Sequence, residues 1–372
     1  MINSIKQTKL VLHNSGMLNV RRSYLHFSGL IAVITGVIFP YLASRCFSTS
    51  STPWQVYKSE ASLVLEKAIP KESLTASPKM NPWFLTGFVD AEGSFIIFVL
   101  KETRNQIGWQ VRGFFEIGLD NKDIALLKEI QLFFGVGKIY EYGSMAYYKV
   151  TSIKDLAVII DHFDKYPLIT QKRADYELFK MVILLISQKE HFTIEGLKKI
   201  VAIKASLNLG LSAELKAAFP EVIPVPRPLI ESTEVKALRP YWLAGFCEGE
   251  GCFFIQITKS KTKTGFAVKL RFQITQHSRD TELMKSLVEY LGCGNYYSKS
   301  NQEIGDLVVE RLGDNLDKII PFFDKYPLVG VKRLNYLNFC RVAELMKNKE
   351  HLTQEGLDQI RQIKSGMNTQ RK

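Results

Sequence analysis

One sequence pattern occurs twice in this chain, and the repetition constrains the fold more than any other feature. Pro82–Phe95 (PWFLTGFVDAEGSF) recurs as Pro240–Phe253 (PYWLAGFCEGEGCF). Asp164–Leu168 (DKYPL) recurs as Asp324–Leu328. From the first of these patterns to the second, matching segments are separated by an offset of 157 to 160 residues. An offset this constant along the whole repeat predicts a duplicated domain, because chance matches would be scattered.

The repeat divides the chain into four segments. Residues 80–211 hold the first copy and residues 239–372 hold the second. Between them, residues 212–238 contain four prolines within nine positions, which is typical of a semi-rigid linker. Residues 1–79 precede the repeat as a basic, partly hydrophobic leader or fused segment, which we expect to be poorly ordered.

The leader has the composition of an organelle targeting sequence. Residues 1–59 contain six Lys and Arg, many Ser and Thr, and no Asp or Glu. This pattern favours a cleaved mitochondrial presequence, and the expected location is the mitochondrion. The uncharged stretch between Tyr24 and Ala43 has about the minimum length of a membrane span, so a transmembrane helix stays open as an alternative. A fused exon product is a further alternative.

The charge of the chain favours a polyanionic partner. The formal net charge is +12, of which residues 1–79 carry +6 and the repeated body +6. Nucleic acid and an anionic membrane surface both fit such an excess. The body is only mildly basic, so a polyanion-binding surface there must arise from where its charges are placed. None of the five cysteines forms a Cys-x-x-Cys pair, which argues against a zinc cluster or a disulfide framework.

Each copy has the same predicted order of elements. A short helix comes first and is followed by two strands joined as a hairpin. A second helix follows, then a pair of short strands bounded by glycine, then two or three helices. Because hairpins pair antiparallel strands, we predict an α+β fold with helices on one face of each sheet. The first helices are expected at 81–92 and 239–250, and the long strands at 94–103, 109–119, 252–260 and 266–276.

The first helix of each copy has a face of small residues. Gly87 and Ala91 are four residues apart, as are Gly245 and Gly249, so each pair lies on one helix face. Such a face lets two helix backbones approach closely. Glycine inside a helix costs up to about 1 kcal/mol relative to alanine, which indicates a packing reason. We therefore expect the two faces to form a helix seam.

Each of these helices ends in a glutamate, Glu92 or Glu250, followed by glycine. We interpret Gly93 and Gly251 as left-handed helix terminators. Parallel packing would bring both carboxylates to one end of the seam, where the helix C-termini add partial negative charge. Hard oxygen ligands of this kind suit Mg²⁺. The alternative is a tight seam capped by solvated glutamates, but the same acid in both copies favours the metal site.

Two nine-residue segments, LTGFVDAEG at 85–93 and LAGFCEGEG at 243–251, resemble the LAGLIDADG motif. Residues 80 to about 368 resemble a monomeric, double-motif LAGLIDADG homing endonuclease of the fungal mitochondrial intron-encoded type. The resemblance implies two tandem αββαββα repeats with pseudo-twofold symmetry, antiparallel β saddles over DNA and central motif helices. It also implies a monomer with an internal pseudo-dimer, and site-specific cleavage of both strands of a double-stranded DNA target. The cuts would leave short 3′ overhangs, with no small-molecule substrate.

The resemblance also assigns roles to acids of the motif. The last acid of each motif binds the divalent metal in the family, and these positions are Glu92 and Glu250. Mg²⁺ is the expected cofactor, with other divalent cations such as Mn²⁺ as alternatives. The earlier acids, Asp90 and Glu248, are expected to be structural.

Three further residues are candidates for the catalytic site. Lys172 and Lys332 occupy a position five residues after the repeated Tyr-Pro proline, where the family often has an active-site lysine. A cation there could stabilise charge on the phosphate, while the alternative is a solvated lysine before a helix. Gln276 matches a polar, solvent-organising position, but the first copy has Leu119 at the equivalent place, so the site is expected to be asymmetric.

Alternating polar residues on the long strands are candidates for reading DNA. Long polar side chains on a two-stranded ribbon can enter the major groove, where Arg and Gln make bidentate base contacts. Residues near the hairpin ends are more suited to phosphates. The alternative is a solvated outer face. The candidates for bases are Gln110, Arg112, Gln256, Thr258, Lys269, Arg271 and Gln273, and those for phosphates are Lys101, Arg104, Lys259, Lys261 and Lys263.

Two other functions remain open for a chain with this pattern. An RNA-binding maturase would assist group I intron splicing, with intron RNA as its partner. A catalytically inactive module would bind DNA without cutting it. Intact Glu92 and Glu250 favour the nuclease, because neither alternative requires both acids.

Overall fold

The computed structural model describes residues 80–230, 239–299 and 302–368. The expected leader at 1–79 and part of the expected linker lie outside these residues. In the portion of the chain that is described, no helix is both long enough and apolar enough to span a membrane.

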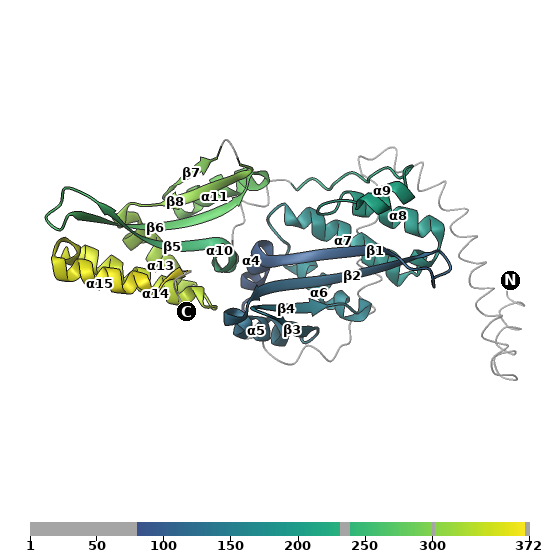
Figure 1. Ribbon diagram of the computed structural model, residues 1–372, viewed down its shortest axis with the longest axis horizontal. Coiled ribbons are helices and arrows are strands. Elements are labelled where there is room, and N and C mark those ends of the chain that lie inside the picture. The colour runs from purple at the N-terminus through teal and green to yellow at the C-terminus, as the bar shows by residue number, and fades with distance from the viewer. Residues whose placement is uncertain (1–79, 231–238, 300–301, 369–372) are drawn as a thin grey trace, which may run out of the picture. The chain divides into compact units, whose positions relative to one another are not determined.

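The first copy contains a four-stranded sheet and a set of helices (Figure 1). Its chain order begins with a helix and a long hairpin, as expected, and both predicted strands end within two residues of their observed bounds. The elements are α4 (Pro82–Glu92), β1 (Gly93–Lys101), β2 (Trp109–Asp120), η2 (Asn121–Asp123), α5 (Ile124–Phe134), β3 (Lys138–Tyr142), β4 (Met145–Val150), α6 (Ile153–Lys165), α7 (Lys172–Ser187), η3 (Glu190–Phe192) and α8 (Ile194–Ala205).

The second copy repeats this order. The elements are α10 (Pro240–Glu250), β5 (Gly251–Lys259), β6 (Phe266–His277), η5 (Ser278–Asp280), α11 (Thr281–Leu291), β7 (Asn295–Ser298), β8 (Ile304–Val309), α12 (Leu312–Asp314), the π-helical turn η6 (Asn315–Ile319), α13 (Ile320–Lys325), α14 (Lys332–Lys347), η7 (Glu350–Leu352) and α15 (Gln354–Ser365).

The expected linker region contains a short helix, α9 (Ala213–Ala218). Leu215 of this helix and Phe219 after it belong to the core of the first copy, where the Phe219 ring packs on Trp109. Arg227 forms an ion pair with Asp175 of α7 at 2.7 Å. The described part of the linker is therefore packed on the first copy.

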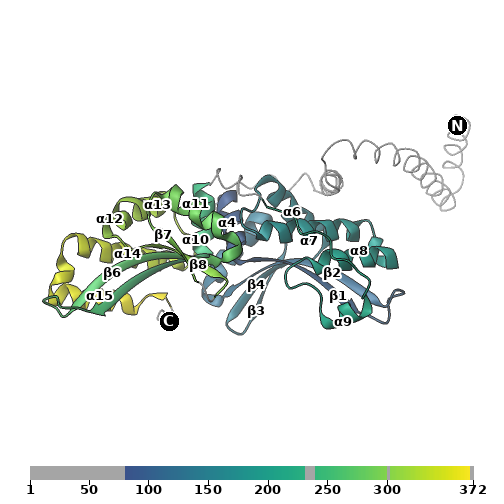
Figure 2. The ribbon, with the colours of Figure 1, turned by 90° about the horizontal axis from the view of Figure 1, so that it is seen from above.

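The two sheets have the same topology. Their strand orders are β1-β2-β4-β3 and β5-β6-β8-β7, and every neighbouring pair is antiparallel. Helices pack on one face of each sheet: α6 and α7 contact the first, and α14 contacts the second. Figure 2 shows α6 and α7 together on one side of the first sheet. The predicted α+β class is confirmed.

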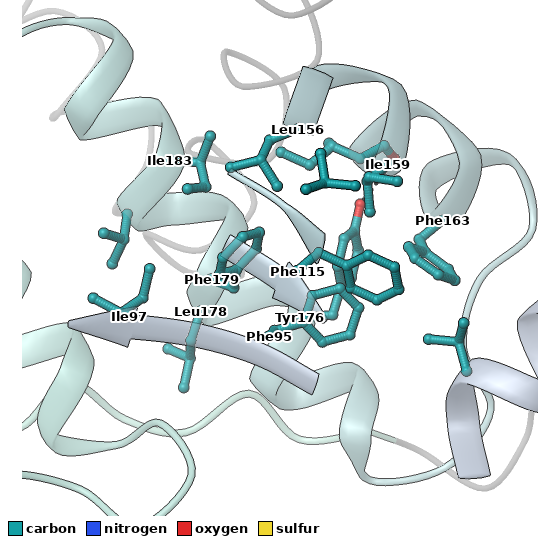
Figure 3. Close-up of a cluster of buried hydrophobic side chains, with 14 of the residues drawn as sticks. Phe95, Ile97, Phe115, Leu156, Ile159, Phe163, Tyr176, Leu178, Phe179 and Ile183 are labelled. Carbon is teal, nitrogen blue, oxygen red and sulfur yellow. Dashed lines mark hydrogen bonds between the residues drawn. The ribbon is translucent and has the colours of Figure 1, made fainter. Parts of the chain in front are cut away.

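Strict alternation on the strands builds the core. In β2 and β6 every second residue is buried through the middle of the strand, so one face packs inward and the other stays accessible. Figure 3 shows Phe95 and Phe115 of the sheet facing Phe163 of α6 and Phe179 of α7. The rings around Phe95 lie 5.3–5.6 Å from it. Truncating such a ring to alanine typically costs about 3–5 kcal/mol.

The glycines after the motif helices are not left-handed terminators, so that prediction was wrong. Gly93 has φ −77° and Gly251 has φ −74°, both extended, because the chain passes directly from helix to strand. A Cβ on Gly93 would overlap the Val89 side chain, and one on Gly251 would lie 2.6 Å from the Cys247 carbonyl oxygen. Glycine serves close packing here.

Candidate active site between the two motif helices

The helices α4 and α10 touch through their backbones. A Cβ on Gly87 would overlap the Trp242 carbonyl oxygen and lie 2.8 Å from the Phe246 amide nitrogen. A Cβ on Gly245 would overlap the Phe84 carbonyl oxygen and lie 2.9 Å from the Phe88 amide nitrogen. The contacts of Gly87 with α10 are therefore nearly the same as those of Gly245 with α4.

The other two small residues of the faces also meet. A Cβ on Gly249 would overlap the methyl group of Ala91. The structure thus brings together all four residues of the expected seam, Gly87, Ala91, Gly245 and Gly249.

Both motif helices begin with proline, which suits the first turn of a helix. The Asn81 side chain caps α4 by accepting a hydrogen bond from the Trp83 amide at 2.9 Å. Arg239 precedes α10 without a side-chain cap, and its guanidinium lies 5.4 Å from the centre of the Trp83 ring. These contacts fix the helix starts and so the position of their far ends.

The candidate metal ligands lie at those far ends. A Cβ on Gly249 would be 3.1 Å from Oε1 of Glu92, so the Glu92 carboxylate lies against the residue before Glu250. Burial, and next the charge of Glu92, raise the pKa of Glu250 to about 6, while Lys172 and Lys332 oppose the rise. The two carboxylates are close enough to repel each other.

The two candidate lysines lie at the same helix ends. Nζ of Lys172 donates hydrogen bonds of 3.0 Å to the carbonyl oxygens of Val89 and Ala91. Nζ of Lys332 donates to the carbonyl oxygen of Gly249. The Val89 oxygen also accepts the amide of Gly93 after the helix. The last carbonyl oxygens of a helix generally lack a partner inside it, and the helix dipole favours a cation there.

Burial lowers the pKa of both lysines, while nearby acids oppose this. For Lys172 the opposing charges are those of Asp90, Glu92 and Glu250. The structure thus places each lysine beside the carboxylates of the motif helices, in a position that differs from that of a solvated side chain.

The earlier motif acids hold the loops that lead to the lysines. Asp90 is buried and accepts hydrogen bonds from the Ile169 amide, from the amide and hydroxyl of Thr170, and from the Trp242 indole. Glu248 accepts one from the Val329 amide at 2.7 Å. Burial raises the pKa of both acids.

Gln276 lies near the end of β6, directly before His277. Its Oε1 accepts a hydrogen bond from the His277 amide at 3.1 Å. Leu119, its counterpart, lines a cavity of about 450 Å³ together with Glu92, Lys332 and Gly249. The Leu119 side chain has no polar group to match the Gln276 amide, so the two copies differ at this position.

The candidate DNA-reading residues share the sheet faces opposite the core. Strand register places Gln256 opposite Lys269, and Gln110 opposite Leu100. Arg112, Thr258 and Lys269 are exposed, as are all five candidates for phosphates, Lys101, Arg104, Lys259, Lys261 and Lys263. Gln110, Gln256, Arg271 and Gln273 are half-buried.

Three of these side chains already have protein partners. Arg104 pairs with Glu102 at 3.0 Å, and Arg271 lies 3.5 Å from Glu310. Nε2 of Gln273 donates to the Thr275 hydroxyl at 2.9 Å.

The shorter strands add polar groups that sequence reasoning missed. Lys149 of β4 pairs with Glu116 of β2 at 2.6 Å. Asp306 of β8 accepts a hydrogen bond from the Thr275 hydroxyl at 2.8 Å and pairs with Lys299 at 2.9 Å. Burial alternates along β4 but not along β8, so Lys149 lies on the accessible face of β4 while Asp306 is buried.

The donor set fits a hard divalent cation that is shared with its substrate. Among the described residues, no group of three or more His, Cys, Asp or Glu side chains is placed to hold a metal ion. Glu92 and Glu250 supply carboxylate oxygens at negatively polarised helix ends. Hard cations such as Mg²⁺ bind through one or two carboxylates and complete their shell with water and phosphate oxygens.

Known proteins share the sequence pattern and the fold of this chain. The LAGLIDADG endonuclease family matches residues 85–183 and 243–343. The Neurospora crassa protein named "Probable intron-encoded endonuclease 2" is 40% identical over 368 residues, covering 96% of this chain and 79% of that protein. The LAGLIDADG homing endonuclease I-SmaMI bound to cleaved DNA is 47% identical, with a TM-score of 0.77, over 79% of this chain and 99% of that chain.

Other solved structures agree with these. I-SmaMI is also known bound to uncleaved DNA in the presence of calcium ions, at 47% identity and a TM-score of 0.76 over 78% of this chain and 99% of that chain. I-GzeII in complex with its DNA target is 43% identical, with a TM-score of 0.74, over 79% of this chain and 100% of that chain. The two matched regions coincide with the two copies described above. The predicted resemblance is confirmed: this chain belongs to the LAGLIDADG endonuclease family.

Proposed function

We propose that this protein is a site-specific DNA endonuclease that hydrolyses both strands of a double-stranded target with divalent metal. The observation that carries the proposal is the meeting of Glu92 and Glu250 at one end of the helix seam. Two pseudosymmetric carboxylates beside each other can serve two scissile phosphates, one on each strand. Relatives named as intron-encoded endonucleases support the same activity.

Glu92 and Glu250 would hold the metal, for which we propose Mg²⁺, with Mn²⁺ as a substitute. A bound divalent cation lowers the pKa of a water ligand and stabilises charge on the phosphate and the leaving oxygen. Lys172 and Lys332 hold positive charge beside the carboxylates, where each can bind a phosphate oxygen or orient water. No side chain is required as a nucleophile.

The polar sheet faces would bind the DNA. The exposed lysines near the hairpin ends are suited to phosphates, which fix the protein's register on the duplex. The strand residues Arg112, Gln256 and Lys269 are suited to base edges. Binding of this kind weakens steeply with salt through counterion release.

We propose the mitochondrion as the location. A relative from Podospora anserina is described as a protein in ND4 intron 1, with 51% identity over 117 residues. The acid-free, basic composition of residues 1–59 supports import into the organelle.

Single-turnover cleavage of a verified target with strand-specific labels tests the proposal. We expect Glu92→Gln and Glu250→Gln each to reduce cleavage at least about 100-fold, because the amide loses the charge that binds metal. DNA affinity should stay within about threefold of wild type, less than 1 kcal/mol. Glu129→Gln, an exposed change on α5, is the matched control and should leave both quantities unchanged.

A maturase or an inactive binding module would give a different result. Binding of the verified target without cutting at any Mg²⁺ concentration would contradict the nuclease. Intron RNA as partner would then be tested by splicing of the host intron, because the relatives are encoded in introns.

A further inference from the structure

We propose that Asp280 and Asp123 are positioning residues that reach from one copy into the other and fix the loop presenting the other copy's lysine. Asp280 belongs to the second copy and holds the loop before Lys172. Asp123 belongs to the first copy and holds the loop before Lys332. The proposal rests on the proposed roles of the two lysines and adds two residues to the reaction.

In the first copy, every backbone amide from 169 to 172 has an acceptor. The amides of Ile169 and Thr170 donate to Asp90, at 2.9 and 3.2 Å. The Gln171 amide donates to Oδ1 of Asp280 at 2.7 Å. The amide of Lys172 itself donates to the Thr170 hydroxyl at 3.2 Å. Asp280 therefore holds the residue directly before the lysine.

The second copy has the reciprocal arrangement. The Val329 amide donates to Glu248 at 2.7 Å, and the Gly330 amide also donates to that carboxylate. The Val331 amide donates to Oδ1 of Asp123 at 2.9 Å. The residue directly before Lys332 is again held by a carboxylate from the other copy.

These bonds satisfy a specific need of the lysine helices. Gln171 and Val331 are the N-cap residues of α7 and α14, and neither helix has a side-chain cap of its own. The first amides of a helix have no partner inside it, and a carboxylate there also complements the helix dipole. An aspartate of the opposite copy takes the place of the missing cap and so fixes where each lysine side chain starts.

The location of the aspartates connects this cap to the DNA face. Asp280 ends the turn η5, which directly follows β6, and Asp123 ends η2, which directly follows β2. Strands β2 and β6 carry five of the seven candidate base-reading residues, Gln110, Arg112, Lys269, Arg271 and Gln273. A long strand in one copy and the lysine in the other are thus joined through one turn and one hydrogen bond.

Burial of the Asp280 carboxylate costs free energy of folding, which indicates that the contact it makes with the lysine loop is needed. It is 4% exposed. Its Oδ1 binds Gln171, but its Oδ2 has no hydrogen-bond partner among the described residues and lies 3.8 Å from Nε of Arg279. A carboxylate taken from water without full compensation destabilises a protein.

The test measures the nicking rate of each strand separately, with the full-length protein and DNA labelled on either strand. Lys172→Met and Lys332→Met first identify the strand that each lysine serves. We expect Asp280→Ala to slow the strand slowed by Lys172→Met at least about 10-fold more than the other strand, as the loss of a bond to a charged group allows. Asp123→Ala should affect the opposite strand.

Controls separate positioning from simple loss of structure. Asp280→Asn keeps an oxygen acceptor for the Gln171 amide and should restore most of the rate. Asp317→Ala, an exposed change in the second copy, should leave both strand rates unchanged. DNA affinity of the alanine variants should stay within about threefold, so that the loss appears in the chemical step.

Hydrogen exchange of the loop amides supplies a readout independent of the lysines' chemistry. Asp280→Ala should speed exchange in peptides covering 169–173 and leave 329–333 unchanged, with the reverse for Asp123→Ala. If both strands slow equally, or the exchange rates do not change, the positioning role is overturned. If exchange changes as expected but neither lysine variant slows cleavage, the proposed roles of the lysines are wrong. The aspartates would then cap the two helices without a role in the reaction.

Discussion

The two lysine loops perform the same task with different parts. In the first copy a short acid, Asp90, faces Thr170, whose hydroxyl donates to it at 2.6 Å. In the second copy a longer acid, Glu248, faces Gly330. A Cβ on Gly330 would lie 2.8 Å from Oε1 of Glu248 and 3.1 Å from Oδ1 of Asp123. The first copy thus pairs a smaller acid with a larger facing residue, and the second copy pairs a larger acid with a glycine.

Both copies therefore keep the lysine loop in the same place, although different residues hold it in each copy. Asp90 also accepts a hydrogen bond from the Trp242 indole of the other copy at 2.7 Å. The counterpart of Trp242 is Phe84, which has no hydrogen to donate. The first loop is therefore tied by side-chain donors, and the second depends more on backbone amides and on the absence of a side chain at Gly330.

The largest effect is expected where the two copies are alike. Gly87→Ala and Gly245→Ala each place a methyl group onto the facing backbone, which cannot move without separating α4 from α10. We expect each to lower the free energy of unfolding by about 3 kcal/mol or more, at the upper end of overpacking costs, and to abolish cleavage. Urea denaturation measures the loss.

A control in the second copy distinguishes clash from helix propensity. Gly313 lies in α12 with no heavy atom closer than 3.9 Å to a Cβ placed there. Gly313→Ala should be neutral or stabilising by up to about 1 kcal/mol. Equal losses at all three glycines would contradict the seam as the cause.

A second difference between the copies concerns a buried polar pair. His162 is 6% exposed, and its Nε2 lies 3.1 Å from the Thr86 hydroxyl, which donates to the Tyr166 carbonyl oxygen. The counterparts are Phe322 and Ala244. Burial, and next the charge of Lys165, lower the pKa of His162 to about 3. The first copy therefore contains a group that resists protonation where the second copy has only carbon.

The sign of its pH dependence is set by linkage. Between pH 6.5 and about 3 the unfolded state binds the proton that folded His162 refuses, so stability is lost as the pH falls through this window. At pH 5 the loss relative to pH 7 is about 2 kcal/mol. Thr86→Ala/His162→Phe copies the second half and should remove this loss. Thermal unfolding at pH 5 and 7 measures it, and an unchanged pH dependence in the double variant would contradict the assignment.

The sequence predicted those features that depend on nearby residues or on a repeated pattern. Alternation along β2 and β6 indicates their buried faces, and the four-residue spacing of Gly87 and Ala91, repeated by Gly245 and Gly249, indicates the seam. The error at Gly93 has a physical reason: whether a glycine after a helix turns left-handed or extends depends on the next element of the chain, and here a strand begins at once.

Other features depend on contacts between distant parts of the chain. The bond from Val331 to Asp123 spans 208 residues, and that from Gln171 to Asp280 spans 109. Neither can be read from a local pattern, because each requires the crossing of α4 and α10 to be known. The one available signal was an aspartate at the same place in both copies, directly before α5 and α11.

The smallest expected effect tests the exchange of volume between the loops. Gly330→Ala should lower the free energy of unfolding by about 1–2 kcal/mol, because the methyl group must displace a hydrogen-bonded carboxylate. Glu248→Asp withdraws that carboxylate by one methylene and imitates the first copy, where an aspartate tolerates Thr170. Gly330→Ala/Glu248→Asp should therefore be less destabilised than the two single changes predict, by about 1 kcal/mol in a double-mutant cycle. Strict additivity would mean that the acid and the glycine do not compensate each other.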